Sequence, residues 1–104
     1  MQDIKPRNNN GIPHGLWKEF HENGQLIFIC NYVNGKPIGP ARWFYPDGKL
    51  KYNLFYYDNL NMRFENYDNN ILKQKGSFKN GVVVGYWETF DNSGKSFSKK
   101  FYAI

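Results

Sequence analysis

The pair Asn23-Gly24 stands between two short runs that are rich in large apolar residues. Such a pair is the strongest short-range signal for a β-hairpin, because a two-residue type I′ turn needs positive φ at both central residues. We therefore predict that residues Leu16 to His21 form one strand and that Gln25 to Tyr32 form its antiparallel partner.

The hairpin pattern returns along the chain. Four units start near residues 11, 35, 59 and 81, spaced by 24, 24 and 22 residues. Gly24, Gly48 and Gly94 close the turns of three units and are expected at positive φ, and Asn70 takes this place in the third unit. No segment has the apolar period of a helix. We therefore predict an all-β fold, an elongated single antiparallel meander of repeated hairpins with about eight strands.

The length of 104 residues fits one domain, which we place at residues 10–104. Residues 1–9 are rich in asparagine and lack the pattern, so we expect a tail or a half-strand at the first edge. These residues contain no apolar leader, and no apolar run approaches the roughly 18 residues of a membrane-spanning helix. We therefore expect a cytoplasmic protein without a transmembrane segment.

Strand alternation sorts the side chains onto two faces of the predicted sheet. With a two-residue first turn, His21 would lie opposite Leu26. One face would then carry Trp17, Leu26, Phe28, Cys30, Tyr32, Trp43, Tyr45, Leu50, Tyr52, Leu54, Tyr56, Leu72, Phe78, Trp87 and Tyr102. The other would carry Leu16, Phe20, Ile27, Ile29, Phe44, Phe55, Tyr57, Tyr86, Phe90, Phe97 and Phe101, interleaved with Lys18, Arg42, Lys51, Lys73, Lys75 and Lys99.

The histidines His14 and His21 and the single cysteine, Cys30, are the obvious candidates for chemistry. Neither histidine has a second histidine or a cysteine at zinc-ligand spacing. We interpret both as ordinary loop or surface residues and Cys30 as a small buried hydrophobe. The carboxylates fall in turns or on strand surfaces, and the glycines follow hairpin spacing rather than a phosphate-binding pattern. We predict no enzymatic activity, no cofactor and no metal site.

The repeat itself resembles a known family. The unit N-G-x3-G-x-W-x2-[FY]-x3-G-x-L-x5-[YF] is similar to the MORN repeat, and most similar to the bacterial variant found in proteins described as antitoxins of toxin–antitoxin systems. The first unit carries the full pattern in Gly11, Gly15, Trp17, Phe20, Gly24, Leu26 and Tyr32. The second unit has Ala41 in place of the tryptophan, the third has lost its glycines, and the fourth has Ser96 in place of leucine. The resemblance implies a meander of hairpins with a scaffold or binding role.

Two functions fit these observations. The first is a protein-binding module, an antitoxin or inhibitor that occludes a partner protein such as a toxin or a host enzyme. The composition, rich in asparagine and lysine, suggests an AT-rich bacterial or phage genome. Aromatic residues make up 19% of the chain, and three are consecutive beside the short third unit. That unit carries asparagine and arginine where a packing neighbour would be apolar, so we expect the aromatic residues beside it to be poorly covered. We therefore predict that partner-binding residues include Arg42, Trp43, Tyr45, Tyr57, Trp87 and Phe90.

The alternative function is binding of nucleic acid or anionic phospholipid. The net charge of +5 is compatible with either ligand and also with an acidic protein. Cations beside aromatic rings suit single-stranded nucleic acid. This interpretation rests on a basic face that joins Arg42 to Lys18, Lys51, Lys73, Lys75 and Lys99.

Overall fold

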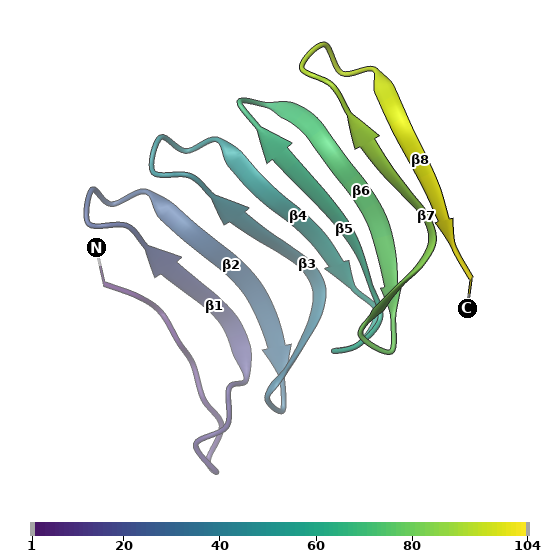
Figure 1. Ribbon diagram of the computed structural model, residues 1–104. Helices are drawn as coiled ribbons and strands as arrows, with labels where there is room; N and C mark the ends of the chain where they lie inside the picture. The colour runs from purple at the N-terminus through teal and green to yellow at the C-terminus, as the bar shows by residue number, and fades with distance from the viewer. Residues whose placement is uncertain (1, 104) are drawn as a thin grey trace.

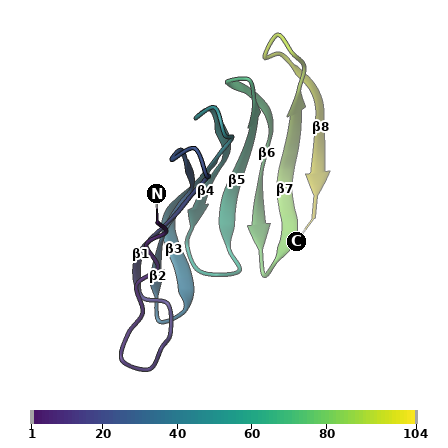
Figure 2. The same cartoon turned by 90° about the vertical axis from the view of Figure 1, so that its left-hand side faces the viewer.

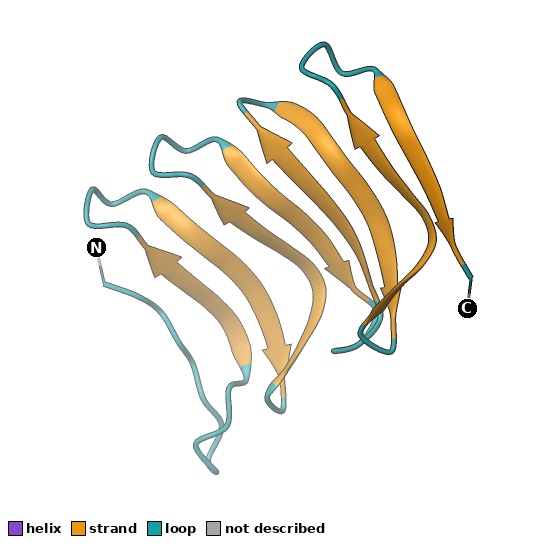
Figure 3. Cartoon of the chain, viewed as in Figure 1, coloured by secondary structure: helices purple, strands orange, loops and turns teal. Residues whose placement is uncertain are grey.

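The computed structural model describes residues 2–103 as one antiparallel sheet of eight strands in chain order (Figure 1). Its dimensions are 47 × 35 × 13 Å, so the sheet is a single layer. Strands and loops account for the whole of residues 2–103, without a helix, as Figure 3 shows. The prediction of an all-β meander is confirmed. The strands are β1 (Gly15–Phe20), β2 (Leu26–Val33), β3 (Lys36–Phe44), β4 (Leu50–Tyr56), β5 (Met62–Asp68), β6 (Ile71–Lys79), β7 (Val82–Phe90) and β8 (Ser96–Tyr102).

The first turn differs from the two-residue type I′ turn that we predicted. Gly24 has a φ of 87°, whereas Asn23 does not have positive φ. The amide of Gly24 donates to the carbonyl of His21 at 2.9 Å, and the amide of His21 donates to the carbonyl of Gln25 at 2.8 Å. The chain thus makes a longer turn in which only the glycine needs the left-handed region. The side chain of Asn23 stabilises this turn by accepting a hydrogen bond from the amide of Gln25 at 2.8 Å.

Two-residue turns with positive φ at both central residues do occur, mostly at the opposite end of the hairpins. They are Asn34-Gly35, with φ of 49° and 85°, and Asn80-Gly81, with φ of 53° and 80°. Asn69 and Asn70 form a third such turn between β5 and β6, with φ of 50° and 65°. The predicted positive φ of Gly24, Gly48 and Gly94 is confirmed, with values of 87°, 91° and 84°.

A β-bulge follows the first turn and changes the predicted register. Trp17 pairs with Cys30 as predicted, but Leu26 pairs with Phe20 and not with His21. The residue left without a partner is Ile27. The same one-residue shift recurs in the other three units, in the pairs β3–β4, β5–β6 and β7–β8. The extra residues there are Lys51, Lys73 and Phe97. An extra residue at a bulge breaks the strict alternation of faces beyond it.

The bulges correct two of the face assignments. Ile27 packs against the buried cluster that contains Phe28, and so it does not belong to the opposite face. The ammonium group of Lys51 lies 5.2 Å from the ring centre of Tyr52, which packs against the same cluster. A one-residue slip is enough to move a side chain from one face to the other.

One face of the sheet, here called the packed face, holds the small core. Its buried residues are Phe28, Cys30, Ala41 and Leu54. Around them the rings of Trp17, Tyr32, Trp43, Tyr52, Phe64, Phe78 and Trp87 contact their neighbours across the strands. Cys30 is 1% exposed and Ala41 0% exposed, because these small side chains lie beneath the larger ones. The rings therefore take the place of a second layer, and each aromatic pair adds roughly 0.5–1.5 kcal/mol beyond its buried area.

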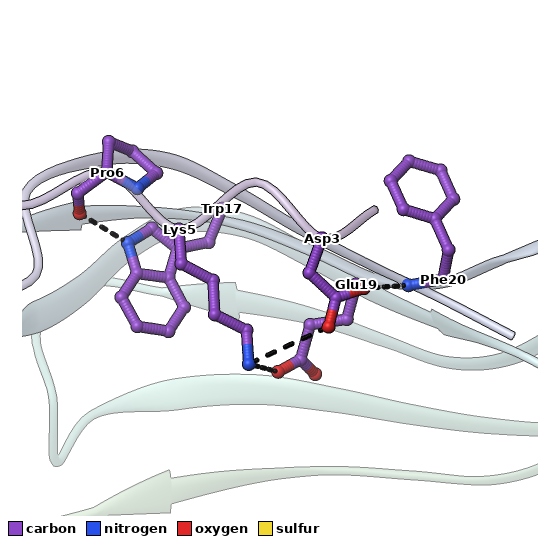
Figure 4. Close-up of polar contacts among 6 residues, drawn as sticks. All are labelled: Asp3, Lys5, Pro6, Trp17, Glu19 and Phe20. Carbon is purple, nitrogen blue, oxygen red and sulfur yellow. Dashed lines mark hydrogen bonds and ion pairs between the residues drawn. The ribbon is translucent and has the colours of Figure 1, made fainter. Parts of the chain in front are cut away.

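The N-terminal segment lies along the free edge of β1. Ile4 and Lys18 exchange two backbone hydrogen bonds of 2.8 Å. The indole nitrogen of Trp17 donates to the carbonyl of Pro6 at 2.8 Å, and Asp3 accepts from the amide of Phe20 at 2.8 Å (Figure 4). These contacts satisfy edge groups that would otherwise be open to pairing with another chain. Figure 2 shows that the single layer twists along its length from β1 to β8.

Candidate partner-binding surface

The second face of the sheet, here called the charged face, carries one row of residues that crosses all eight strands. Each member pairs directly with the next, from β1 to β8. In chain order the row is Lys18, Ile29, Arg42, Asn53, Glu65, Lys75, Glu88 and Lys99. Glutamates thus alternate with cations in its C-terminal half, so this face is not uniformly basic.

Exposed rings lie beside this row. Phe55 and Arg63 pair directly next to it, and Tyr86 and Phe101 pair on β7 and β8. Phe55, Tyr57 and Tyr86 are 37%, 57% and 59% exposed. Apolar rings that remain open beside charged groups are typical of interaction surfaces.

A shallow hollow of about 480 Å³ opens on the charged face over β3 to β7. Its polar wall is a chain of hydrogen bonds. Arg42 donates to the side-chain oxygen of Asn53 at 3.3 Å, and the Asn53 amide donates to Glu65 at 2.8 Å. The hydroxyl of Tyr67 donates to the same carboxylate oxygen at 3.3 Å. Burial raises the pKa of Tyr67, and the charge of Glu65 raises it further. Neutral donors therefore hold Glu65 in place.

The two arginines of the hollow have no carboxylate within ion-pair distance among residues 2–103. The Arg63 guanidinium lies 5.7 Å from the ring centre of Phe55 and 6.0 Å from that of Tyr57. Both Arg42 and Arg63 are exposed. The hollow therefore offers two guanidinium groups next to open aromatic rings. The third cation, Lys75, lies 3.9 Å from a Glu88 carboxylate oxygen.

The structure separates the partner-binding residues that the sequence predicted. Arg42 lines the hollow, and Tyr57 lies beside it, in ring contact with Phe55 at 5.2 Å. Phe90 belongs to the same face, because the Lys75 ammonium lies 5.8 Å from its ring centre. The roles of these residues in binding remain predictions.

Trp43 and Trp87 lie on the packed face instead. We expected them to lack a packing neighbour in the third unit, and this premise is wrong. Phe64 of that unit stacks on Trp87 at 5.7 Å with an interplanar angle of 16°, and it also contacts Tyr52, which packs against Trp43. The prediction overlooked Phe64 because it considered only the asparagine and arginine residues of that unit.

Tyr45 directly follows the last residue of β3 and begins the turn between β3 and β4. Its hydroxyl donates to the carbonyl of Tyr67 at 3.0 Å, and the ammonium of Lys51 lies 5.6 Å from its ring centre. Lys73, which also occupies a bulge, donates to the side chain of Asn92 in the last hairpin turn. The predicted basic face is therefore divided, because only Lys18, Arg42, Lys75 and Lys99 share the row.

The histidines and the cysteine that were considered for chemistry contact the backbone or lie buried in the core. His14 accepts a hydrogen bond from the amide of Asn34 at 3.1 Å through Nδ1, and His21 Nε2 lies 3.3 Å from the carbonyl of Phe44. Burial raises the pKa of Cys30 to about 11, so its thiol is neutral and a poor nucleophile. Among residues 2–103, no group of three metal-ligating side chains comes together. The interpretation of Cys30 as a buried hydrophobe is confirmed.

Sequence reasoning missed Arg63, Phe55 and Tyr86 as members of one site. Phe55 and Tyr86 had been assigned to the correct face, but 31 positions separate them in the sequence. The register of four successive strands, β4 to β7, brings them to the same hollow. Direct pairing of Phe55 with Arg63 was not predictable without the loop length between β4 and β5.

Comparison with known families agrees with the repeat pattern. Residues 13–34 and 37–59 match the MORN repeat variant, and these ranges cover most of the first two units. No curated protein and no solved structure matches the chain. None of residues 2–103 belongs to a helix able to cross a membrane. MORN repeats are generally non-catalytic binding modules. The first two hairpin units are therefore similar to MORN repeats of the variant type, which confirms the MORN part of the resemblance.

Proposed function

We propose that the protein is a non-enzymatic protein-binding module, a small antitoxin or inhibitor that covers the active surface of a partner protein. The observation that carries this proposal is the hollow of the charged face, with the open rings of Phe55 and Tyr86 in it and that of Tyr57 beside it. A thin sheet needs one face of rings for its own stability, and the packed face fulfils that need. The exposed rings of the other face contact one another in pairs, as Phe55 does Tyr57 and Tyr86 does Phe101, but they do not pack against the buried cluster.

The residue types on this face suit protein recognition. Tyrosine and arginine are the residues that most often dominate binding energy, and here they are Tyr57, Tyr86, Arg42 and Arg63. Phe90 extends the surface towards the turns. Trp43 and Trp87, on the opposite face, would support this surface by holding β3 and β7 in position. Binding of a phosphate backbone is less favoured, because Glu65 and Glu88 interrupt the cationic row.

Affinity purification from the source organism tests the proposal. The immobilised protein is incubated with nuclease-treated extract and washed at low and high salt. We expect one retained protein that survives high salt, because apolar contacts are screened little, and that is lost with Tyr57→Ser or Tyr86→Ser. Val82→Ser is the matched control, since Val82 is 61% exposed at the first position of β7 and does not line the hollow.

Coexpression then tests the antitoxin role. The captured protein, expressed alone, should arrest growth or show an enzymatic activity, and the present protein should suppress that effect. The proposal is wrong if the retained material is nucleic acid or lipid that elutes at moderate salt, or if no retained protein depends on the charged face.

A further inference from the structure

We infer that the hollow of the charged face binds an extended acidic segment of the partner protein, with one carboxylate on Arg42, one on Arg63 and an apolar side chain between them. This inference rests on the proposed function and adds the chemistry of the partner. Its first support is the state of the two guanidinium groups. Both are exposed, and neither has a carboxylate within ion-pair distance among residues 2–103.

The carboxylate nearest in the row does not serve these arginines. Glu65 receives hydrogen bonds from Asn53 and Tyr67, at 2.8 and 3.3 Å, and among residues 2–103 it makes no ion pair. Asn53 meanwhile accepts from Arg42, so it orients the guanidinium without neutralising it. Arginine pairs with carboxylates through two parallel hydrogen bonds, and this geometry is available when one edge of the group is free.

The pattern of charges favours separate carboxylates over a phosphate backbone. A nucleic-acid strand places a charge on every nucleotide, and along this row it would meet Glu65 and Glu88 as well as the cations. A peptide with two acidic residues can engage Arg42 and Arg63 while Glu65 keeps its hydrogen bonds and Glu88 keeps its ion pair with Lys75. Like charges brought together at an interface are unfavourable, which disfavours the polyanion.

The spacing of the arginines sets the spacing of the acidic residues. Arg42 lies on β3, and Glu65 is the β5 residue in the same row. Arg63 lies two positions before Glu65 on β5. Two strand spacings and two residue steps correspond to about 12 Å between their Cα atoms. Residues four apart in an extended chain are about 13 Å apart. Phe55 lies between the two arginines in the pairing scheme and can receive an apolar side chain.

Labelled peptides test this inference by fluorescence anisotropy with the full chain. The probe peptide carries two glutamates four residues apart around a central phenylalanine, and a second peptide has glutamines in their place. A third keeps the glutamates and has serine at the centre. We expect measurable binding of the first peptide, and at least about tenfold weaker binding of the other two. Arg42→Gln and Arg63→Gln should each weaken binding of the first peptide by about tenfold.

Lys100→Gln is the matched control, because it removes the same charge from an exposed residue next to Lys99 that alternates onto the other face. Circular dichroism checks that each variant is folded. Equal binding of the glutamate and glutamine peptides, equal loss with the control, or stronger binding of a single-stranded oligonucleotide or of anionic phospholipid vesicles would each overturn the inference. If no peptide binds while a native partner still requires Tyr57 and Tyr86, the acidic-segment inference fails and the proposed function stands.

Discussion

Replacement of Gly76 by alanine tests whether the packed face supports the fold as the structure indicates. A Cβ atom at this position would lie 2.2 Å from Cε3 and 2.7 Å from Cζ3 of Trp87. The indole would have to leave its stack on Phe64 and its edge contact with Phe78. Overpacking costs about 1–3 kcal/mol, and a lost aromatic pair about 0.5–1.5 kcal/mol. Alanine regains about 0.5–1 kcal/mol over glycine within a strand. We therefore expect a net loss of about 0.5–4 kcal/mol, with a central value of about 2 kcal/mol.

Urea denaturation followed by circular dichroism measures this change. A double-mutant cycle gives the sharper result, because in a Trp87→Leu background the clash is relieved and Gly76→Ala should be neutral or stabilising. The matched control is Ser77→Ala on the neighbouring residue, which should change the free energy of unfolding by less than about 0.5 kcal/mol. If Gly76→Ala is equally destabilising with and without the indole, the cost does not come from Trp87 and the reasoning is refuted.

Three further predictions concern the turn, the thiol and the edge. Gly24→Val should destabilise the protein by more than about 1 kcal/mol in urea denaturation, because valine strains a backbone held at φ 87°. No clash adds to this cost, since nothing lies within 4 Å of the new Cβ. An unchanged denaturation midpoint would contradict the turn. Burial raises the pKa of Cys30 from 9.0 to about 11, so the folded state favours the neutral thiol. The contribution of this thiol to the free energy of unfolding is therefore full below pH 9 and is lost between pH 9 and 11. Wild type should therefore lose stability more steeply than Cys30→Ala over that range, and parallel curves would exclude this linkage. Asp3→Ala removes the acceptor for the amide of Phe20, so hydrogen exchange of this amide should accelerate while the amides of β6 keep their rates.

The sequence was sufficient to predict the number of strands, their order and the hairpin repeat. Those features depend on glycine and asparagine at fixed intervals, and each acts locally through the backbone conformation it allows. The type of each turn was harder to predict. Asn23-Gly24 and Asn34-Gly35 have the same two letters, yet only the second pair has positive φ at both residues. The bulge at Ile27 accompanies the longer first turn, and no residue type marks it in the sequence.

The candidate site was less predictable because it depends on register across several strands. Arg42 and Tyr57 were selected from the local excess of aromatic residues, and both lie in or beside the hollow. Trp43 was selected by the same argument, but alternation placed it on the packed face. Local composition identifies a strand that is loaded with aromatic residues. It does not identify which of those residues is covered, because that depends on the strands on either side.

If the proposed function holds, the two faces of this sheet divide stability and recognition between adjacent residues. On β3, Trp43 contacts Phe28 at 4.4 Å on the packed face, while Arg42 points into the hollow on the other. A single-layer sheet has no second layer to separate these roles, so a substitution on either face moves the same backbone. Partner binding to the charged face should consequently protect the packed face as well. Because a ligand that binds only the folded state raises its stability, the acidic peptide should slow exchange of amides on β3 to β7 together.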